Sequence, residues 1–368
     1  MKIALVHDHL AQDGGAEKVL KSFSEIWPEA PIYVWLYDKD GANPYFKKKD
    51  IRPSFIQNLP FAKKMYKRYL PLLPSATESY DLSEFDVVLS DTASLGKGVI
   101  TGINTMHICY CHTPTRYLWS DKDIVIDRWE RGKIIGSLAK IYKTYLRTWD
   151  RLSVDRVDAF IANSRFIAKR IKKYYRRDSV VIYPPIETDR FKLADKIGDF
   201  YLIGGRLVNY KRYDLVVKAF NRLGIPLKIF GDGPAYKELK KMANSNIEFL
   251  GRISDEEMVK LYSQAIAFLH PQVEDFGITP LESQAAGRPV IAFGSGGALE
   301  TVILGKTGEF FKYQEWEALA ETVIKFKPES YNPLEIKAWA EKFSEQIFKD
   351  KMKSFVEKAY ASFKEKNN

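Results

Sequence analysis

The chain has 368 residues, of which 45% are hydrophobic and 28% charged, and its formal net charge is +10 at pH 7. This length favours two domains over one small module, and the composition excludes a disordered or fibrous protein. The two cysteines, Cys109 and Cys111, are too few for a disulfide framework, which predicts a reducing, cytoplasmic location. The first apolar run ends at Asp8, and no stretch approaches the roughly 18 apolar residues of a spanning helix, so neither a signal peptide nor a membrane span is expected.

Strands and helices are predicted to alternate along the first half of the chain. Apolar residues at helical spacing predict a helix at 16–26, and a longer helix is predicted at 134–157. Runs rich in β-branched residues predict strands at Ile3–Val6, Ile32–Leu36, Val87–Leu89, His107–Cys111, Ala159–Ala162 and Val180–Tyr183. This alternation indicates a parallel sheet covered by helices on both faces.

The second half repeats the plan with shorter helices. Its predicted strands are Tyr201–Ile203, Leu227–Phe230, Ile247–Leu250, Ile266–Leu269 and Val290–Phe293. The sequence therefore predicts the α/β class with two doubly wound, Rossmann-like domains, 1–184 and 185–348. We place the boundary and a hinge at Pro184-Pro185, because a proline pair continues neither a helix nor a strand ladder. The charged tail from Asn332 onward is predicted to be helical.

The basic excess is concentrated in the first half. Residues 1–190 hold 31 Lys and Arg against 23 Asp and Glu, a net of +8, whereas the remainder holds 26 against 24, a net of +2. Segment 45–70 interleaves aromatic side chains with Lys47, Lys48, Lys49, Arg52, Lys63, Lys64, Lys67 and Arg68. Such a segment suits an anionic membrane surface or a nucleic acid, or is the solvated face of a helix. We favour peripheral contact with a membrane and expect no nucleic acid.

Open parallel sheets bind ligands beyond the carboxyl ends of their strands, so the loops there are where chemistry is expected. Gly14-Gly15 separates the first strand from the first helix. Glycines let the backbone approach a ligand, and the amides of a helix N-terminus then point at an anion such as phosphate. A tight turn needs glycine in any case, so this motif alone is a weak signal.

The loop after the first strand of the second half adds fixed cations. Gly204-Gly205 is followed by Arg206, Lys211 and Arg212. Arginine offers a bidentate fork and lysine a point charge, and together they suit a pyrophosphate whose negative charge grows as it leaves.

Two carboxylates flank a third loop. If a helix begins near Thr279, the backbone amides of Gly277 and Ile278 face a ligand. Glu274 on the loop and Glu282 on the helix can then grip two hydroxyl-bearing parts of one molecule. Favourable acidic residues at a helix start explain Glu282 poorly, because a carboxylate inside the helix gains little from the dipole.

A fourth loop follows the strand His107–Cys111. Alternation places Cys109 and Cys111 on one face and presents His112 at the strand end. Metal binding by Cys-x-Cys-His would need a second ligand pair, which the sequence lacks. The thiols are therefore predicted to lie in the core, with His112 as the polar contact.

In this order, the motifs resemble the retaining GT-B glycosyltransferases of family four over nearly the whole chain. The resemblance rests on Gly14-Gly15, Gly205-Arg206 with Lys211, the pair Glu274 and Glu282, and Gly296-Gly297-Ala298-Leu299-Glu300. Cys111–Trp119 is further similar to the branch containing O-antigen and exopolysaccharide mannosyltransferases. The resemblance implies two domains facing each other across a cleft, and a final helix, 349–368, that returns to the first domain.

The resemblance also implies a donor site in the second domain. Arg206 and Lys211, with Arg212 as a further candidate, would neutralise the donor diphosphate, while Glu274 would contact the donor sugar and Glu282 the ribose hydroxyls. The other implied donor contacts are Gly14, Gly15, Gly205, Phe276, Gly277, Ile278 and, near the nucleobase, Arg252 and Ile253.

In the first domain, His112 is implied to lie near the transferred sugar, which makes it a catalytic candidate with Glu274, Lys211 and Arg206. Arg116 and Tyr117 lie where an acceptor could enter. The implied reaction is a retaining transfer of a hexose, best guessed as mannose from GDP-mannose, to a lipid-linked or membrane-proximal saccharide in surface polysaccharide synthesis. The enzyme would act at the inner face of the plasma membrane.

No metal or other cofactor is expected. Asp38-Lys39-Asp40 and Asp121-Lys122-Asp123 match the D-x-D pattern of metal-dependent transferases, but such triplets arise easily by chance and the other motifs contradict that fold. The alternatives are a UDP-sugar donor, a nucleotide-sugar epimerase, and a basic binding module for membrane or nucleic acid.

Overall fold

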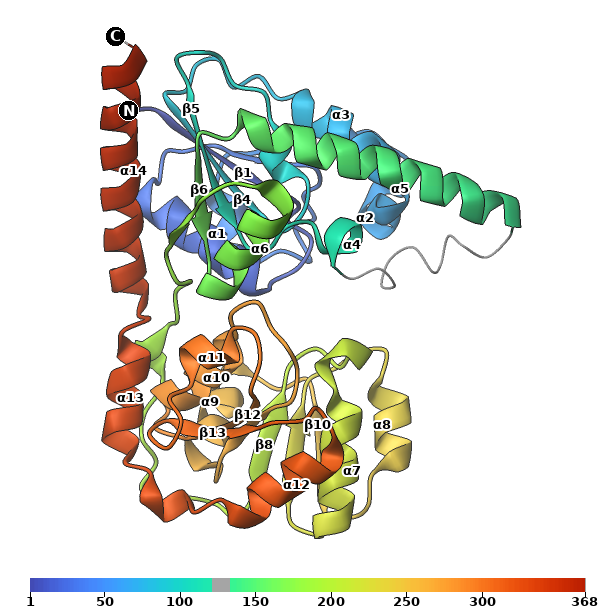
Figure 1. Cartoon of the computed structure of the whole chain (residues 1–368), viewed down its shortest axis with the longest axis vertical. Helices are drawn as coiled ribbons and strands as arrows, with labels where there is room; N and C mark the ends of the chain where they lie inside the picture. The colour runs from blue at the N-terminus through green and yellow to red at the C-terminus, as the bar shows by residue number, and fades with distance from the viewer. Residues whose placement is uncertain (121–132, 368) are drawn as a thin grey trace. The chain divides into compact units, whose positions relative to one another are not determined.

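The computed structural model describes residues 1–120 and 133–367. Contacts divide the chain into two compact units: Met1–Tyr183 with Phe348–Asn368, and Pro184–Ile347. We call them the first and the second unit. Each contains one parallel sheet with helices on both faces (Figure 1).

The sheet of the first unit has the order β3-β2-β1-β4-β5-β6-β7, and its paired strands are parallel. Its strands are β1 (Ile3–His7), β2 (Ile32–Val34), β3 (Ile51–Pro53), β4 (Val87–Thr92), β5 (Met106–Cys111), β6 (Ala159–Ala162) and β7 (Val180–Val181). The chain moves outward from β1 to β3 and then crosses to the other side at β4. The carboxyl ends of β1 and β4 therefore flank the switch point at which doubly wound sheets bind ligands.

The helices of the first unit cover both faces of this sheet. They are α1 (Gly15–Ile26), α2 (Ala62–Met65), α3 (Leu73–Glu78), α4 (Arg116–Trp119), α5 (Lys133–Ser153), α6 (Arg165–Tyr175) and, from Phe348 on, α14 (Glu345–Asn367). On one face, α1 and α14 pack together through Phe23 and Phe348. On the other, α6 covers Cys109 and Cys111, which are buried and free, as the strand alternation predicted.

The second unit repeats the topology with six strands in the order β10-β9-β8-β11-β12-β13. The strands are β8 (Tyr201–Gly204), β9 (Leu227–Phe230), β10 (Ile247–Gly251), β11 (Phe268–His270), β12 (Val290–Phe293) and β13 (Gly308–Phe311). One face packs against α7 (Tyr213–Leu223), α8 (Tyr236–Met242) and α12 (Trp316–Lys325). The other packs against α9 (Asp255–Gln264), α10 (Ile278–Ala285), α11 (Ala298–Thr301) and α13 (Pro333–Glu341).

The predicted α/β class with two doubly wound parallel sheets is confirmed. Sequence reasoning missed β13 and β3, and β3 lies inside the basic segment 45–70. That segment is not one helix with a solvated face, as one alternative supposed. It consists of β3, α2 and the 3-10 turns Pro44–Lys48, Phe55–Asn58 and Tyr66–Leu72. Within the described ranges, no helix combines the length and apolarity that a membrane span requires.

Candidate active site

Two glycines bring the backbones after β8 and β9 together. Gly205 and Gly231 both have positive φ angles, +119° and +110°. A Cβ added to Gly231 would lie 1.9 Å from the carbonyl oxygen of Gly205, so a larger residue would push the two loops apart. The loop that carries the predicted cations is thereby held against the neighbouring strand.

Lys211 and Glu274 form an ion pair, with 3.5 Å between Lys211 Nζ and Glu274 Oε1. Both side chains are mostly buried, at 16% and 18% exposed. The carbonyl oxygen of Glu274 accepts a hydrogen bond from the amide of Gly297 at 2.8 Å, so the Gly296-Gly297 motif fixes the Glu274 loop. The structure thus joins two residues that lie 63 positions apart in the sequence.

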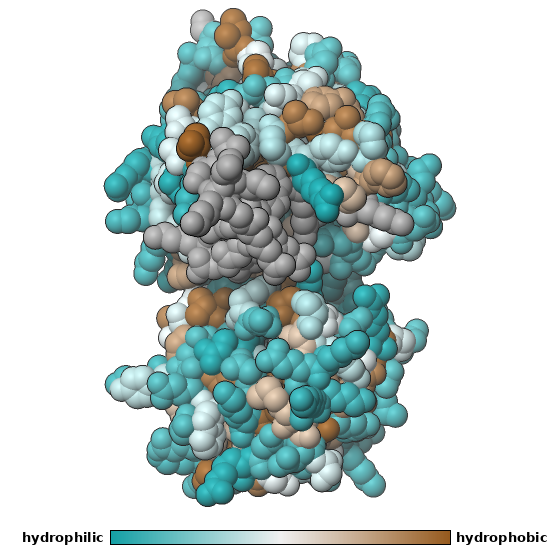
Figure 2. Space-filling view, turned by 90° about the vertical axis from the view of Figure 1, so that its right-hand side faces the viewer, coloured by the Kyte–Doolittle hydropathy of each residue, from teal (hydrophilic) through white to brown (hydrophobic). Residues whose placement is uncertain are grey.

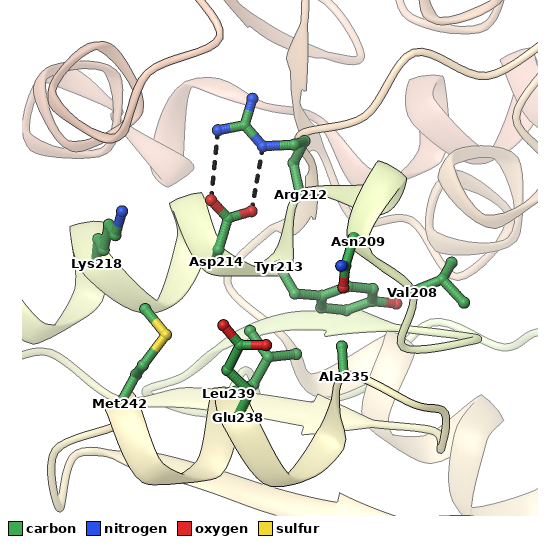
Figure 3. Close-up of a pocket in the computed structure, with 10 residues that line it drawn as sticks. All are labelled: Val208, Asn209, Arg212, Tyr213, Asp214, Lys218, Ala235, Glu238, Leu239 and Met242. Atoms are coloured by element: carbon green, nitrogen blue, oxygen red, sulfur yellow. Dashed lines mark hydrogen bonds and ion pairs between the residues drawn. The ribbon is translucent and has the colours of Figure 1, made fainter. Parts of the chain in front are cut away.

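The two arginines of the same loop, Arg206 and Arg212, are not part of this ion pair. Arg206 is exposed. The guanidinium of Arg212 is held by Asp214 (3.1 Å from Nε to Oδ1) and by Gln314. Arg212 and Asp214 line a cavity of about 380 Å³ between α7 and α8, where Figure 3 shows the guanidinium turned onto the Asp214 carboxylate. Arg212 is therefore already neutralised by a carboxylate.

The helix predicted near Thr279 begins one residue earlier, at Ile278, with Gly277 as its N-cap in the left-handed region (φ +101°). The side chain of Phe276 is buried and packs on Phe343, so it is not open to a ligand. Glu282 is buried one turn into the helix and accepts a hydrogen bond from Tyr262 Oη at 3.2 Å.

His270 lies beneath this helix start. Its side chain is fully buried, and neither ring nitrogen has a hydrogen-bond partner among the described residues. Burial, with the nearby charge of Lys211, lowers the pKa of His270 to about 3, so the ring is neutral. A Cβ added at Gly277 would lie 3.6 Å from His270 Nε2, which places the ring directly under the loop.

The predicted nucleobase contacts lie at the end of β10. Arg252 is 85% exposed and pairs with Asp232 (3.4 Å), while Ile253 packs partly into the core. The structure brings Arg252 to the end of β9 through Asp232, next to Gly231.

In the first unit, the Gly14-Gly15 turn is fixed from inside the helix. Gly14 is the N-cap of α1, and its amide donates to Glu17 Oε2 at 3.1 Å. Glu17 also accepts from Gln12 Nε2 at 3.1 Å and is 2% exposed. Its pKa is lowered because the contacts with His7 outweigh the effect of burial.

His112 follows β5 as predicted, and the structure adds partners that sequence reasoning missed. Its Nε2 lies 2.6 Å from Oδ1 of Asp91, which is completely buried at the end of β4. Oδ2 of Asp91 meets Nδ1 of His7 at 2.9 Å, and His7 Nε2 lies 3.9 Å from Glu17 Oε1. His7 and Asp91 are polar residues at the carboxyl ends of adjacent strands, and that pattern was the signal available in the sequence.

The candidate acceptor residues sit in α4. Arg116 is partly buried, and the Tyr117 hydroxyl shares a hydrogen bond with Ser94 Oγ at 2.8 Å while its ring packs against the core. The start of α4 is held by buried Asp150, which accepts from Thr115 Oγ1 at 2.7 Å. Tyr117 is thus more a part of the core than the sequence suggested.

Only the first of the two D-x-D triplets lies among the described residues. The carboxylate of Asp38 pairs with Lys63 at 3.2 Å, and the second triplet, Asp121–Asp123, lies outside the described residues. Over the ranges that the structure describes, no group of three or more His, Cys, Asp or Glu side chains is arranged to hold a metal ion.

Comparison with known families agrees with this architecture. The family described as Glycosyltransferase Family 4 matches residues 13–190, and the family described as Glycosyl transferases group 1 matches residues 185–343. The protein is a glycosyltransferase, and it belongs to family 4 of these enzymes.

Among its relatives, the alpha-1,3/1,6-mannosyltransferase ALG2 of Mus musculus is 27% identical over 320 residues, which cover 75% of this chain and 74% of the relative. The D-rhamnosyltransferase WbpZ of Pseudomonas aeruginosa is 31% identical over 189 residues, 46% and 49% of the two chains.

Solved structures share the fold. HepE of Anabaena, crystallised with UDP, superimposes with a TM-score of 0.73 at 16% identity over 97% of this chain and 100% of that one. Sucrose-phosphate synthase of Thermosynechococcus elongatus gives 0.74 at 16% identity, over 98% and 100%. The GT-B fold expected from the sequence is confirmed.

Proposed function

We propose that this enzyme transfers mannose from GDP-mannose to a lipid-linked or membrane-proximal saccharide, with retention of configuration and without a metal ion. The observation that carries the proposal is the Lys211–Glu274 pair beside the glycine-rich loop, in a chain whose relatives include mannosyltransferases. A cation and a carboxylate side by side suit a ligand that joins a diphosphate to a sugar.

Most of the groups that we assign to the nucleotide-sugar donor belong to the second unit. Lys211 and exposed Arg206 neutralise the diphosphate, and the amides of Gly277 and Ile278 at the start of α10 add partial positive charge. Negative charge grows on the diphosphate as the sugar leaves, so fixed cations and amides stabilise the transition state without a metal. Glu274 contacts the sugar.

Further donor contacts have a structural basis in two other side chains. Glu282 is held by Tyr262, so its carboxylate is fixed for the ribose hydroxyls. Arg252, at the end of β10, lies next to the strand ends where we assign the nucleobase. In the first unit, Gly14 and Gly15 are assigned to the diphosphate and His112 to the transferred sugar, and the acceptor enters near Arg116.

A thermal-shift panel tests the donor. GDP-mannose, GDP, UDP-glucose, UDP-N-acetylglucosamine and ADP-glucose are each added with and without EDTA. A ligand at 100 times its dissociation constant stabilises the protein by about 2.7 kcal/mol. We expect GDP-mannose and GDP each to raise the melting temperature by the same amount with EDTA as without it. A shift by UDP compounds alone would overturn the GDP assignment, and a loss of the shift in EDTA would overturn metal independence.

Product analysis separates transfer from the alternative reactions. An epimerase converts the nucleotide sugar with no acceptor present, whereas a transferase does so only with one. NMR of the anomeric proton in the product then reports retention directly, and an inverted product would contradict the retaining mechanism.

We also propose that segment 45–70 of the first unit docks on an anionic membrane. Phe61 is 73% exposed and Phe55 41%, and Lys47, Lys48, Lys63 and Arg68 of the same segment are exposed as well. The side chains of Lys64 and Lys67 lie outside the described ones. Figure 2, which faces the side of the first unit where α2 and α5 lie in Figure 1, shows apolar residues scattered among hydrophilic ones. Aromatic insertion combined with basic charge is the usual basis of interfacial binding.

Vesicle flotation tests this surface. We expect binding to phosphatidylglycerol vesicles that weakens with salt and is absent with phosphatidylcholine alone. Phe61→Ser reduces binding, whereas Ile103→Ser, which changes an 88% exposed residue elsewhere in the unit, does not. Equal binding by both variants would contradict the assignment of this segment, and salt-sensitive binding to DNA without vesicle binding would favour nucleic acid.

A further inference from the structure

A row of four side chains crosses the ligand-binding end of the first sheet: Glu17, His7, Asp91 and His112. The first three are 0–3% exposed and His112 is 12% exposed. Asp91 and His7 carry none of the roles assigned above. Burying this much charge away from water is costly unless each member supports another, so the row calls for a functional account.

The oxygens around His7 determine where its protons lie. Nδ1 faces both the carbonyl oxygen and Oδ2 of Asp91, each at 2.9 Å, and a nitrogen that faces two acceptors is the donor. Nε2 faces the carboxylate of Glu17. Burial alone would lower the pKa of His7, but the hydrogen bond to Asp91 and the nearby charges of Asp91 and Glu17 outweigh it and raise the pKa well above its usual value. His7 is therefore a cation between two carboxylates.

Asp91 in turn presents an ionised carboxylate to His112. The distance of 2.6 Å between Oδ1 and Nε2 is that of a charge-assisted hydrogen bond. An ionised carboxylate can only accept, so Nε2 of His112 carries a proton. In the neutral imidazole, Nδ1 is then the acceptor.

The backbone of His112 is also held by hydrogen bonds on both sides. Its amide donates to the carbonyl oxygen of Thr92 at 2.9 Å, and its own carbonyl oxygen accepts from Asn163 Nδ2 at 3.0 Å. Because Asp91 is fully buried and His112 is not, a substrate hydroxyl can reach the ring but not the carboxylate behind it.

We propose that Asp91 is a positioning residue for the transfer reaction: it holds His112 in the Nε2–H tautomer, so that Nδ1 accepts a hydrogen bond from a hydroxyl of the transferred sugar. This inference rests on the proposed assignment of His112 to the sugar. His7 and Glu17 position Asp91 from behind. Glu17 also accepts a hydrogen bond from the amide of Gly14, so the same row of side chains supports the loop assigned to the diphosphate.

The tautomer can be measured without knowing the donor. The sequence contains five histidines, so long-range ¹H–¹⁵N spectra of protein labelled at histidine are simple to read. His112→Gln identifies the signals of His112 by their disappearance. We expect the Nε2–H tautomer in the wild-type protein. The Nδ1–H tautomer, or an equal mixture, would overturn the inference, and neither result depends on the outcome of the donor panel.

Asp91→Asn tests the consequence for catalysis. Asparagine keeps the shape but offers an amide that can donate, so His112 is no longer held in one tautomer. We expect kcat with GDP-mannose to fall by about 10²- to 10⁴-fold, as when the carboxylate behind another catalytic histidine is made an amide. The dissociation constant of GDP should stay within about threefold, because the carboxylate is not assigned to the nucleotide.

Ser90→Ala is the matched control. Ser90 precedes Asp91 in β4 and faces the other side of the sheet, where its hydroxyl contacts Nε2 of buried His107 at 2.9 Å. It should lose stability but keep kcat. If Asp91→Asn keeps kcat, or loses it only in proportion to the folded fraction with the tautomer of His112 unchanged, Asp91 is merely structural. If this variant does not fold, His7→Gln and the wild-type tautomer decide the question.

Discussion

Both units place a glycine-rich loop between a first strand and a helix, but they hold it in different ways. In the second unit, Gly205 and Gly231 press two backbones together, and the nearby charges are the partly exposed pair Lys211 and Glu274. In the first unit, the loop is capped from within by Glu17, a member of a buried, charged row.

Two buried histidines show what this difference means. His270 faces no carboxylate hydrogen-bond partner, and burial lowers its pKa to about 3. His7 is equally buried, yet Asp91 and Glu17 raise its pKa. Partners, and not burial, therefore decide which histidine is charged. The buried charged groups of the first unit pair with one another and affect the reaction only through His112. The ion pair Lys211–Glu274 of the second unit, by contrast, can be rearranged by a bound ligand.

Within the second unit, the largest effect is expected at the pair Lys211 and Glu274. Glu274→Gln and Lys211→Ala should each lower kcat with GDP-mannose by about 10²- to 10³-fold, the scale for removing one group that stabilises transition-state charge. Lys218→Ala, an exposed lysine on α7, is the control and should keep full activity. Steady-state kinetics with circular dichroism as a check on folding measures this. Wild-type rates in either pair variant would contradict the proposed site.

The close backbone approach gives the next effect. Gly231→Ala adds a Cβ 1.9 Å from a carbonyl oxygen at a positive φ angle, and should cost about 3 kcal/mol or more of unfolding free energy. Gly224→Ala also has a positive φ (+69°) but meets open space. It should cost about 1 kcal/mol, the strain alone. Urea unfolding compares the two, and equal losses would show that the approach of the two loops is not rigid.

Sequence reasoning named more of the side chains that the structure brings together in the second unit than in the first, for a physical reason. Residues such as Lys211 and Glu274 stand in loops with glycines, where motif and chemistry coincide. The fold class followed from alternation, since each strand is a short apolar run. Sequence reasoning missed β3 because Ile51–Pro53, at the sheet edge, has one partly buried and two exposed residues and lacks an apolar run.

Three members of the buried row, Glu17, His7 and Asp91, were hidden because they lie within regular elements. His7 and Asp91 stand at the ends of strands that are adjacent in space but 84 residues apart in the chain. Their pairing depends on the strand order, with β1 next to β4, which periodicity alone does not reveal. The hydrogen bond between Tyr117 and Ser94 was hidden for the same reason, because Ser94 lies on another loop.

The pH dependence of stability sharpens the contrast between the two histidines. The raised pKa of His7 stabilises the fold fully below the unfolded value of about 6.5, and this contribution is lost as the pH rises through the folded pKa. His270 behaves in the opposite way. Its pKa of about 3 makes the fold lose stability as the pH falls below about 6.5, because only the unfolded chain binds the proton.

His7→Gln and His270→Gln test these slopes by urea unfolding between pH 5 and 9. His7→Gln should cost about 1.5 to 3 kcal/mol at pH 6, the scale of hydrogen bonds to charged groups, and less at pH 9. His270→Gln should become more favourable relative to the wild type as the pH falls toward 5. Parallel pH profiles for both variants would show that the two rings are protonated alike.

The smallest effect is expected at the exposed rim of the second unit. Arg252 is 85% exposed and its partner Asp232 is 51% exposed, so solvent screens their pairing and Arg252→Ala should change the unfolding free energy by less than about 0.5 kcal/mol. If Arg252 lies beside the nucleobase, the same variant should weaken GDP binding by about 3- to 10-fold while kcat at saturating donor is retained. Calorimetry with GDP measures this, and Lys237→Ala on α8 is the control. Unchanged GDP affinity would show that the nucleobase does not bind at the end of β10. The assignment of Lys211 and Glu274 to the donor site would not be affected.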